Sequence, residues 1–205
     1  MLSVNMALLW SDDTEQIVKG VSEATNNIVS YYNAPKTSKN MLSELRADIN
    51  SVCDFWTGKT YVGTPKVDVI KNAFQSFFEE LMRLLLTMKD SKKTYEARIA
   101  NDMLFRGTVY RYLGNAKPSN KPVYPIFDNV YVSWSKCSEN SYILSKLYGP
   151  VTLLTCEITE PLYGIDLTAI GCSRVNEQEV VFPTIAECIR EIKYLRAKEE
   201  DDKND

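Results

Sequence analysis

The chain of 205 residues contains no histidine, and this absence excludes several kinds of site. A Ser-His-Asp triad or a Cys-His pair would have no imidazole to act as its general base. A zinc site would lack its commonest nitrogen ligand. Any chemistry must therefore use carboxylate, guanidinium, amine, hydroxyl or thiol groups.

Cysteine is scarce and its spacing is unlike that of a metal site or a disulfide framework. The five cysteines never form a Cys-x-x-Cys pair and are Cys53, Cys137, Cys156, Cys172 and Cys188. An odd number of widely spaced cysteines favours reduced thiols in a cytosol. We therefore expect a cytoplasmic protein without a metal, and the cytosol of a host cell stays open as its location.

Long apolar runs and the common phosphate-binding loops are also missing. Neither G-x-x-x-x-G-K-[ST] nor G-x-G-x-x-G occurs in the sequence. No apolar run reaches the length of a membrane span, and residues 1–10 carry no basic leader, so we expect neither a membrane segment nor a signal peptide. The net charge of −3 argues against broad electrostatic binding to nucleic acid.

Residues 1–99 are predicted to form an N-terminal helical region. Apolar side chains recur there at intervals of three and four residues, which is typical of amphipathic helices. The expected helices run from Asp13 to Tyr32, from a cap at Ser38, from Thr64-Pro65 and from about Ser91. The aromatic residues of the third helix are expected to pack in the core.

Residues 100–197 are predicted to be rich in β-strands. Residues 198–205 form a charged tail that we expect to be disordered. Short runs rich in Val, Ile, Phe and Tyr alternate with turn residues, which is typical of strands. The predicted strands are 103–111, 130–133, 151–158, 162–170 and 179–182. Residues 112–127 are expected to be a loop, and 137–147 and 184–198 are expected to be helices.

Three fragments of this second region contain the candidate chemistry. They are Leu104–Gly107, with an arginine and a glycine; Tyr131–Ser135, with a Ser-x-Ser sequence; and Asn176–Pro183, with a Glu-x-Glu sequence. Each alone is ordinary, since a strand arginine is often a surface residue and Ser-x-Ser is often a helix cap. Their occurrence together in this order points to function.

The ordered fragments resemble the Arg–Ser–Glu class of ADP-ribosyltransferases, especially its bacterial and bacteriophage members. The resemblance covers residues 100–183 and is closest in Glu177–Pro183. It implies an α+β fold: a split pair of packed antiparallel or mixed sheets that holds NAD in a cleft, preceded by a helical region. Residues 100–197 would then form the NAD-binding core.

The resemblance assigns the two glutamates to catalysis. Glu179 would stabilise the oxocarbenium-like ribose that forms when the nicotinamide bond breaks, and would hold a ribose hydroxyl. Glu177 would accept a proton from the attacking nucleophile. Side chains two residues apart on a strand point to the same side, so both can serve one site.

The other assigned residues would bind NAD, and two of them, Arg106 and Ser133, would also belong to the catalytic set. Arg106 would hold the pyrophosphate through its paired donors, and Gly107 would allow close approach of the backbone to the nicotinamide amide. Ser133 would orient Glu179 or the ribose. Arg111 is a rival for the arginine role, and the glycine next to Arg106 favours Arg106.

The aromatic residue that would stack on nicotinamide is not singled out by the sequence. Four candidates stay open: Tyr131, which we include in the expected NAD site, Trp134, Tyr148 and Tyr163. Many members of the class have Ser-Thr-Ser where this chain has Ser133-Trp134-Ser135, so its local packing should differ.

The expected function is mono-ADP-ribosylation of a macromolecule with release of nicotinamide, as in a toxin or a phage factor. The paired glutamates resemble members that modify arginine, which favours a protein arginine as the acceptor. An RNA or DNA base, water as in an NAD glycohydrolase, and a non-catalytic binding module remain alternatives. An antitoxin or regulatory partner stays open, and no membrane or metal partner is expected.

Overall fold

The computed structural model describes residues 3–33, 39–58, 67–115, 119–169 and 178–196. The chain divides into two compact units, with the boundary between Met103 and Leu104. The first holds the four long helices, and the second begins at Leu104 and holds the strands. The protein is therefore of the α+β class.

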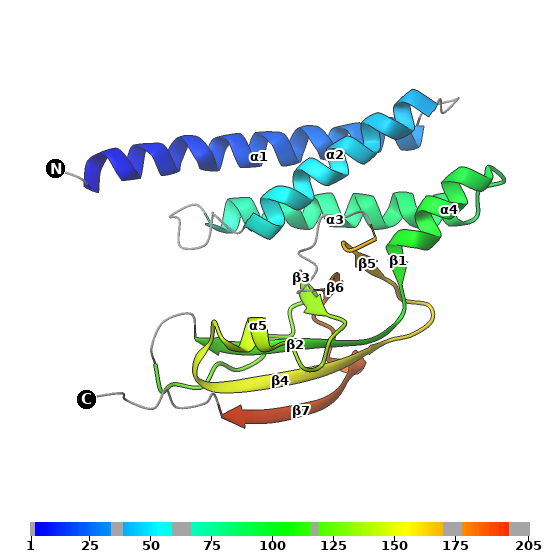
Figure 1. The fold of residues 1–205 in the computed structure, drawn as a ribbon. Helices are drawn as coiled ribbons and strands as arrows, with labels where there is room; N and C mark the ends of the chain where they lie inside the picture. The colour runs from blue at the N-terminus through cyan, green and yellow to red at the C-terminus, as the bar shows by residue number, and fades with distance from the viewer. Residues whose placement is uncertain (1–2, 34–38, 59–66, 116–118, 170–177, 197–205) are drawn as a thin grey trace. The chain divides into compact units, whose positions relative to one another are not determined.

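The helical unit consists of α1 to α4 (Figure 1). Their bounds are Ser3–Asn33 for α1, Lys39–Gly58 for α2, Val67–Lys89 for α3 and Thr94–Met103 for α4. Helix α1 contacts α2 and α3, and α3 also contacts α4. None of the helices described combines the length and the apolar character needed to span a bilayer.

The core of the helical unit consists of the residues that the apolar spacing predicts. On α1 these are Ile17, Val21, Ala24, Ile28 and Tyr31, all buried. On α3 they include Phe74, Phe77 and Phe78, and the Trp56 ring of α2 packs edge-on against Phe74 at 5.2 Å and Phe78 at 5.0 Å. Edge-to-face geometry suits the ring quadrupoles. The expected caps at Ser38 and Thr64-Pro65 lie outside the described residues.

The second unit contains an antiparallel seven-stranded sheet with the order β1-β5-β6-β3-β2-β4-β7 (Figure 1). The bounds are Leu104–Phe105 for β1, Gly107–Asn115 for β2, Tyr131–Ser135 for β3, Tyr148–Ile158 for β4, Gly164–Asp166 for β5, Glu179–Pro183 for β6 and Ile189–Arg196 for β7. A short helix α5, Ser141–Leu144, precedes β4 and is capped by Asn140.

The sheet is curled, because β1 and β2 are separated only by Arg106 yet lie far apart in the strand order. Within the sheet, β2 and β3 pair at a single position, Tyr110 opposite Ser135. A four-stranded segment, β1-β5-β6-β3, and a three-stranded segment, β2-β4-β7, thus meet at one narrow joint. The expected pair of separate packed sheets is instead one continuous sheet with this joint.

The core of the second unit lies on one side of β6. Val180 and Phe182 enter a buried cluster with Val109, Trp134 and Leu154. The indole Nε1 of Trp134 donates a hydrogen bond of 3.1 Å to the Phe182 carbonyl, so this tryptophan is fully partnered within the core. Because side chains alternate along a strand, Glu179 and Val181 project to the opposite side.

The helix predicted for residues 184–198 is wrong. A short 3₁₀ turn, Ala186–Cys188, is followed by the strand β7, which pairs with β4 from Pro150 to Cys156. The spacing of Ile185, Cys188, Ile189, Ile192 and Leu195 fits a helix. Long-range pairing with β4 overrides this local pattern and leaves Ile192 largely exposed.

Three smaller expectations also change. The predicted helix at 137–147 shrinks to α5, the strand at 162–170 shrinks to the three residues of β5, and the loop predicted from Tyr112 starts later because β2 runs to Asn115. Each shift reflects pairing or capping that residue composition does not encode. The strand predicted at 103–111 is two strands, β1 and β2, separated by Arg106. The strands predicted at 130–133, 151–158 and 179–182 are confirmed, with no bound shifted by more than three residues.

Gly149 is a position where the fold requires glycine. Its φ is +67°, and a Cβ there would lie 1.9 Å from the Ser119 carbonyl oxygen. We expect Gly149→Ala to destabilise the protein by at least about 2 kcal/mol, because neither backbone can yield cheaply. Thermal unfolding followed by circular dichroism measures this, with Lys146→Ala as a surface control. An unchanged melting temperature would contradict it.

The buried thiols of β4 and the turn before β7 should be unreactive. Burial raises the pKa of Cys156 to about 12, and it also raises the pKa of Cys188. At pH 8 the Cys156 thiolate fraction is then on the order of 10⁻⁴, and the thiolate is the reactive form. We expect iodoacetamide to modify the half-buried Cys137 but not Cys156 until denaturant is added, as read by mass spectrometry. Equal labelling of both in the native protein would refute this.

Candidate functional site

The β3–β6 ladder brings the serines of one predicted fragment to the glutamate of another. Ser135 is paired directly with Glu179, and Ser133 is paired with Val181. Paired residues share a face of the sheet, so both serines and Glu179 lie on the side opposite the core. Two of the three sequence fragments therefore converge in one place.

The backbone around Glu179 is held from both sides. The Leu167 amide donates to the Glu179 carbonyl at 3.0 Å, and the Lys136 amide donates to the Gln178 carbonyl at 3.0 Å. Gln178 has a φ of +45°, which is unusual for a residue with a side chain. Glu179 itself is only 1% exposed. The second predicted carboxylate, Glu177, lies outside the described residues.

Ser135 is a site residue that the sequence reasoning did not choose. It is 2% exposed, and its hydroxyl oxygen accepts hydrogen bonds from the Cys137 amide at 3.1 Å and from Asn140 Nδ2 at 3.5 Å. These donors leave its own hydrogen for an acceptor, and Glu179 is the residue directly opposite. The sequence does contain a signal for Ser135, because it is the second serine of the Ser133-Trp134-Ser135 motif.

Arg111, the rival arginine, lies beside the serine fragment. Its Nη1 donates a hydrogen bond of 2.8 Å to the Ser133 carbonyl across the joint between the two sheet segments. Burial lowers the pKa of Arg111 to about 10, and the negative charges of Asp128 and Glu179 partly oppose this. The side chain remains a cation at neutral pH and ties β2 to β3 where the ladder has a single pair.

Arg106, the predicted pyrophosphate ligand, makes its described contacts elsewhere in the unit. Its Nε donates to the Leu162 carbonyl at 3.2 Å, and its Nη1 lies 3.4 Å from Glu160 Oε2. Its guanidinium stacks on the Tyr163 ring, 3.9 Å from the centroid. The structure thus groups Arg106 with the β4–β5 connection, and the strands that flank Arg106, β1 and β2, each lie two strands from β6 in the sheet.

The remaining predicted residues are placed as follows. Gly107 has a φ of +135°, a conformation that explains why glycine follows Arg106. Tyr131 pairs with Pro183, at the end of the β3–β6 ladder opposite to Glu179. Tyr148 begins β4, opposite Asn115 at the far end of β2 from Gly107. Trp134 lies in the core, so Tyr163 is the aromatic candidate beside Arg106.

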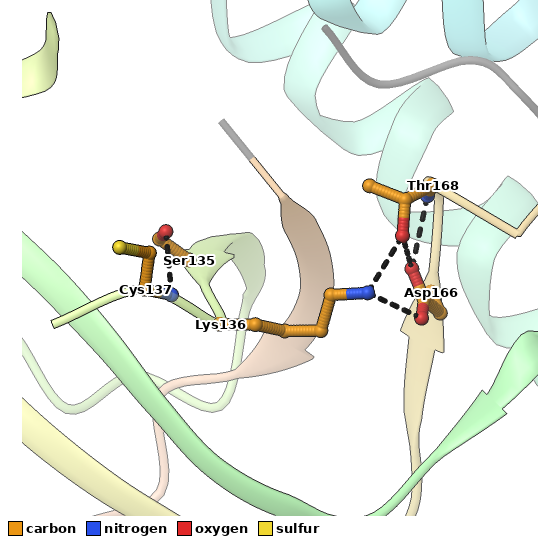
Figure 2. A network of polar contacts seen from close by, with 5 residues as sticks. All are labelled: Ser135, Lys136, Cys137, Asp166 and Thr168. Atoms are coloured by element: carbon orange, nitrogen blue, oxygen red, sulfur yellow. Dashed lines mark hydrogen bonds and ion pairs between the residues drawn. The ribbon is translucent and has the colours of Figure 1, made fainter. Parts of the chain in front are cut away.

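A polar network borders the start of β6 (Figure 2). The Lys136 Nζ lies 2.8 Å from Asp166 Oδ2 and donates to Thr168 Oγ1 at 2.7 Å. The Thr168 amide donates to Asp166 Oδ1 at 2.9 Å. The side chains of Lys136 and Asp166 are 25% and 13% exposed, so the ion pair is largely shielded from water. None of these three residues lies in one of the three motifs that contain the candidate NAD-binding and catalytic residues.

In the part of the chain that the structure describes, no group of three or more Cys, Asp or Glu side chains could hold a metal ion. The arrangement offers a buried carboxylate beside hydroxyl groups, with Arg111 on β2 next to Ser133 and Arg106 between β1 and β2. Such a set can stabilise a cation and bind an anion.

In comparisons with known proteins, no family model matches the chain, no curated protein matches its sequence, and no solved structure matches its fold.

Proposed function

We propose that the chain is an NAD-dependent mono-ADP-ribosyltransferase that releases nicotinamide and transfers ADP-ribose to a macromolecule. The observation that carries this proposal is the pairing of the Ser133–Ser135 segment with Glu179 on one face of β3–β6. The resemblance of the three motifs to the Arg–Ser–Glu class supports it independently. At the level of the fold, the narrow joint between two segments of the sheet suits the split sheet of that class.

The reaction follows from the groups present. The bond between nicotinamide and C1′ of the ribose breaks, and its electron pair leaves with nicotinamide. The cation that develops on the ribose is stabilised by Glu179, whose buried setting strengthens the attraction. Ser135 or Ser133 orients that carboxylate. Because Glu179 is buried, binding of NAD has to expose it.

The reaction is completed when the acceptor attacks C1′ and takes up the ADP-ribose group. A nitrogen of the acceptor forms the new bond to C1′, and its proton passes to Glu177, which the Glu-x-Glu sequence puts two residues from Glu179. Paired glutamates accompany arginine as the acceptor in the class that the chain resembles. We therefore propose a protein arginine, and a nucleic-acid base or water as acceptor is distinguished by the assay below.

Arg106 is better suited than Arg111 to bind the pyrophosphate. Its ion partner Glu160 is 82% exposed, and an exposed pair contributes at most about 1 kcal/mol, so a pyrophosphate can displace it. Arg111 is buried and already bonded to the Ser133 carbonyl. Arg106 is thus the exchangeable cation, with Tyr163 beneath it as a candidate for stacking.

Substitution of Glu179 tests the activity itself. With labelled NAD and a cell lysate, we expect Glu179→Gln to lower the rate of label transfer by about 10²–10³-fold, because the charge that stabilises the ribose cation is lost. Exposed Glu187→Gln is the matched control and should keep full activity. Loss of label on protease digestion identifies a protein acceptor, and loss on nuclease digestion identifies nucleic acid. Nicotinamide release without labelled macromolecule indicates hydrolysis, and no NAD consumption by the unmodified chain rejects the proposal.

Substitution of the two arginines separates binding from architecture. We expect Arg106→Gln to raise the KM for NAD by about 10–100-fold with little change in melting temperature, since a charge-assisted contact to phosphate is lost. Arg98→Gln, which removes another exposed arginine with a loose carboxylate partner at 4.0 Å, is the control. If Arg106→Gln leaves KM unchanged while Arg111→Gln raises it, the pyrophosphate role belongs to Arg111.

A further inference from the structure

The Lys136–Asp166 ion pair crosses the strand that carries Glu179. Lys136 directly follows β3, Asp166 ends β5, and β6 lies between these two strands in the sheet. Figure 2 shows the Lys136 side chain reaching from the end of β3 toward Asp166 and Thr168. The pair therefore ties the two neighbours of β6 together at the end where β6 begins.

The backbones of the same two segments hold the residues at that point. Lys136 donates its amide hydrogen to the Gln178 carbonyl, and Leu167, next to Asp166, donates its amide hydrogen to the Glu179 carbonyl. One side-chain ion pair and two backbone hydrogen bonds thus close around Gln178 and Glu179. If the ends of β3 and β5 separated, both backbone bonds would weaken together.

Gln178 explains why this part of β6 needs to be held. Its φ of +45° is a left-handed conformation that costs about 1 kcal/mol or more for a residue with a side chain. Such a conformation persists only where the surroundings over-determine it. Released from its neighbours, Gln178 would return to negative φ, and the direction of the Glu179 side chain would change with it.

The polar contacts of Lys136 argue against a direct role in binding a ligand. Its ammonium already has two oxygen partners, Asp166 Oδ2 at 2.8 Å and Thr168 Oγ1 at 2.7 Å, and its side chain is 25% exposed. Asp166 is in turn held by the Thr168 amide. A ligand phosphate would have to displace a shielded carboxylate from this lysine.

We propose that Lys136 and Asp166 are positioning residues that clamp the Gln178–Glu179 backbone and so set the direction of the Glu179 carboxylate. The mechanical part of this inference stands on the structure alone, and its effect on catalysis rests on the proposed transferase function. The clamp acts through the backbone and touches no substrate atom. Misplacing a reacting group by about 1 Å can lower a rate by about 10²-fold.

The first arm of the experiment reads the backbone by amide hydrogen exchange in NMR. In Lys136→Met and in Asp166→Asn, we expect exchange of the Leu167 amide to accelerate by about 10-fold or more, because local opening becomes easier. Amides of the β2–β4 ladder, such as that of Leu154, should keep their rates. Lys146→Met, which removes an exposed lysine of the same unit, is the matched control. An unchanged Leu167 rate, or equal acceleration at Leu154, would overturn the clamp.

The second arm reads catalysis with purified full-length chain and NAD. We expect both variants to lower kcat by about 10–100-fold with KM for NAD within about 3-fold, since positioning and not binding is lost. Lys136→Arg should restore most of kcat, and the double variant should be no worse than the single ones, because the two residues act as one unit. A raised KM with unchanged kcat would show that Lys136 binds NAD itself and would refute the positioning role.

The two arms of the experiment test the clamp and the transferase function independently. If the unmodified chain does not consume NAD, the proposed function fails, and the exchange arm alone still decides whether the clamp exists. If the chain is active and the Leu167 amide is unaffected by Lys136→Met, the clamp fails and the function stands.

Discussion

The register of β6 against β3 is the constraint on which the candidate site depends. Val180 and Phe182 enter the core, so Glu179 has to face the other side, where Ser135 lies opposite it. A slip of one residue would turn Glu179 into the apolar cluster and expose both core residues. The apolar core thus determines the position of the polar site, because burial of Phe182 and Val180 excludes the alternative register.

The joint between the two segments of the sheet determines which groups Arg111 and Ser133 bind. Where β2 and β3 separate after the pair of Tyr110 with Ser135, the carbonyl of Ser133 is left without a ladder partner from β2, and Arg111 donates to it instead. A half-buried carbonyl gains from such a donor. The cation that results lies close enough to Glu179 to feel its charge. Arg111 therefore both links β2 to β3 and places a positive charge near Glu179.

The start of β6 combines strain with support. Gln178 is held at positive φ, and the segments on either side of it supply two backbone hydrogen bonds and one shielded ion pair. Strained backbone is retained in proteins where surrounding contacts over-determine it, and it gathers at functional sites. In this chain the strained residue immediately precedes the carboxylate for which the motifs predict a function.

Local pattern alone determined the helical unit, since the spacing of residues such as Val21, Ile28 and Phe77 identifies the faces that are buried. It also predicted the strands that carry the three motifs, whereas the shared face of Ser133 and Glu179 follows from the register of β3 against β6. Helix faces and strand positions depend on near neighbours in the chain, which is why a sequence can reveal them.

Only the tertiary structure decided the conformation of residues 189–196 and the long-range partners in the candidate site. It made residues 189–196 a strand, because pairing with β4 satisfies backbone groups that a helix would have satisfied internally. It placed Ser135 opposite Glu179, Arg111 at Ser133 and Lys136 at Asp166. These partners are 22 to 44 residues apart, and their meeting depends on the register and curl of the sheet, which no local pattern specifies.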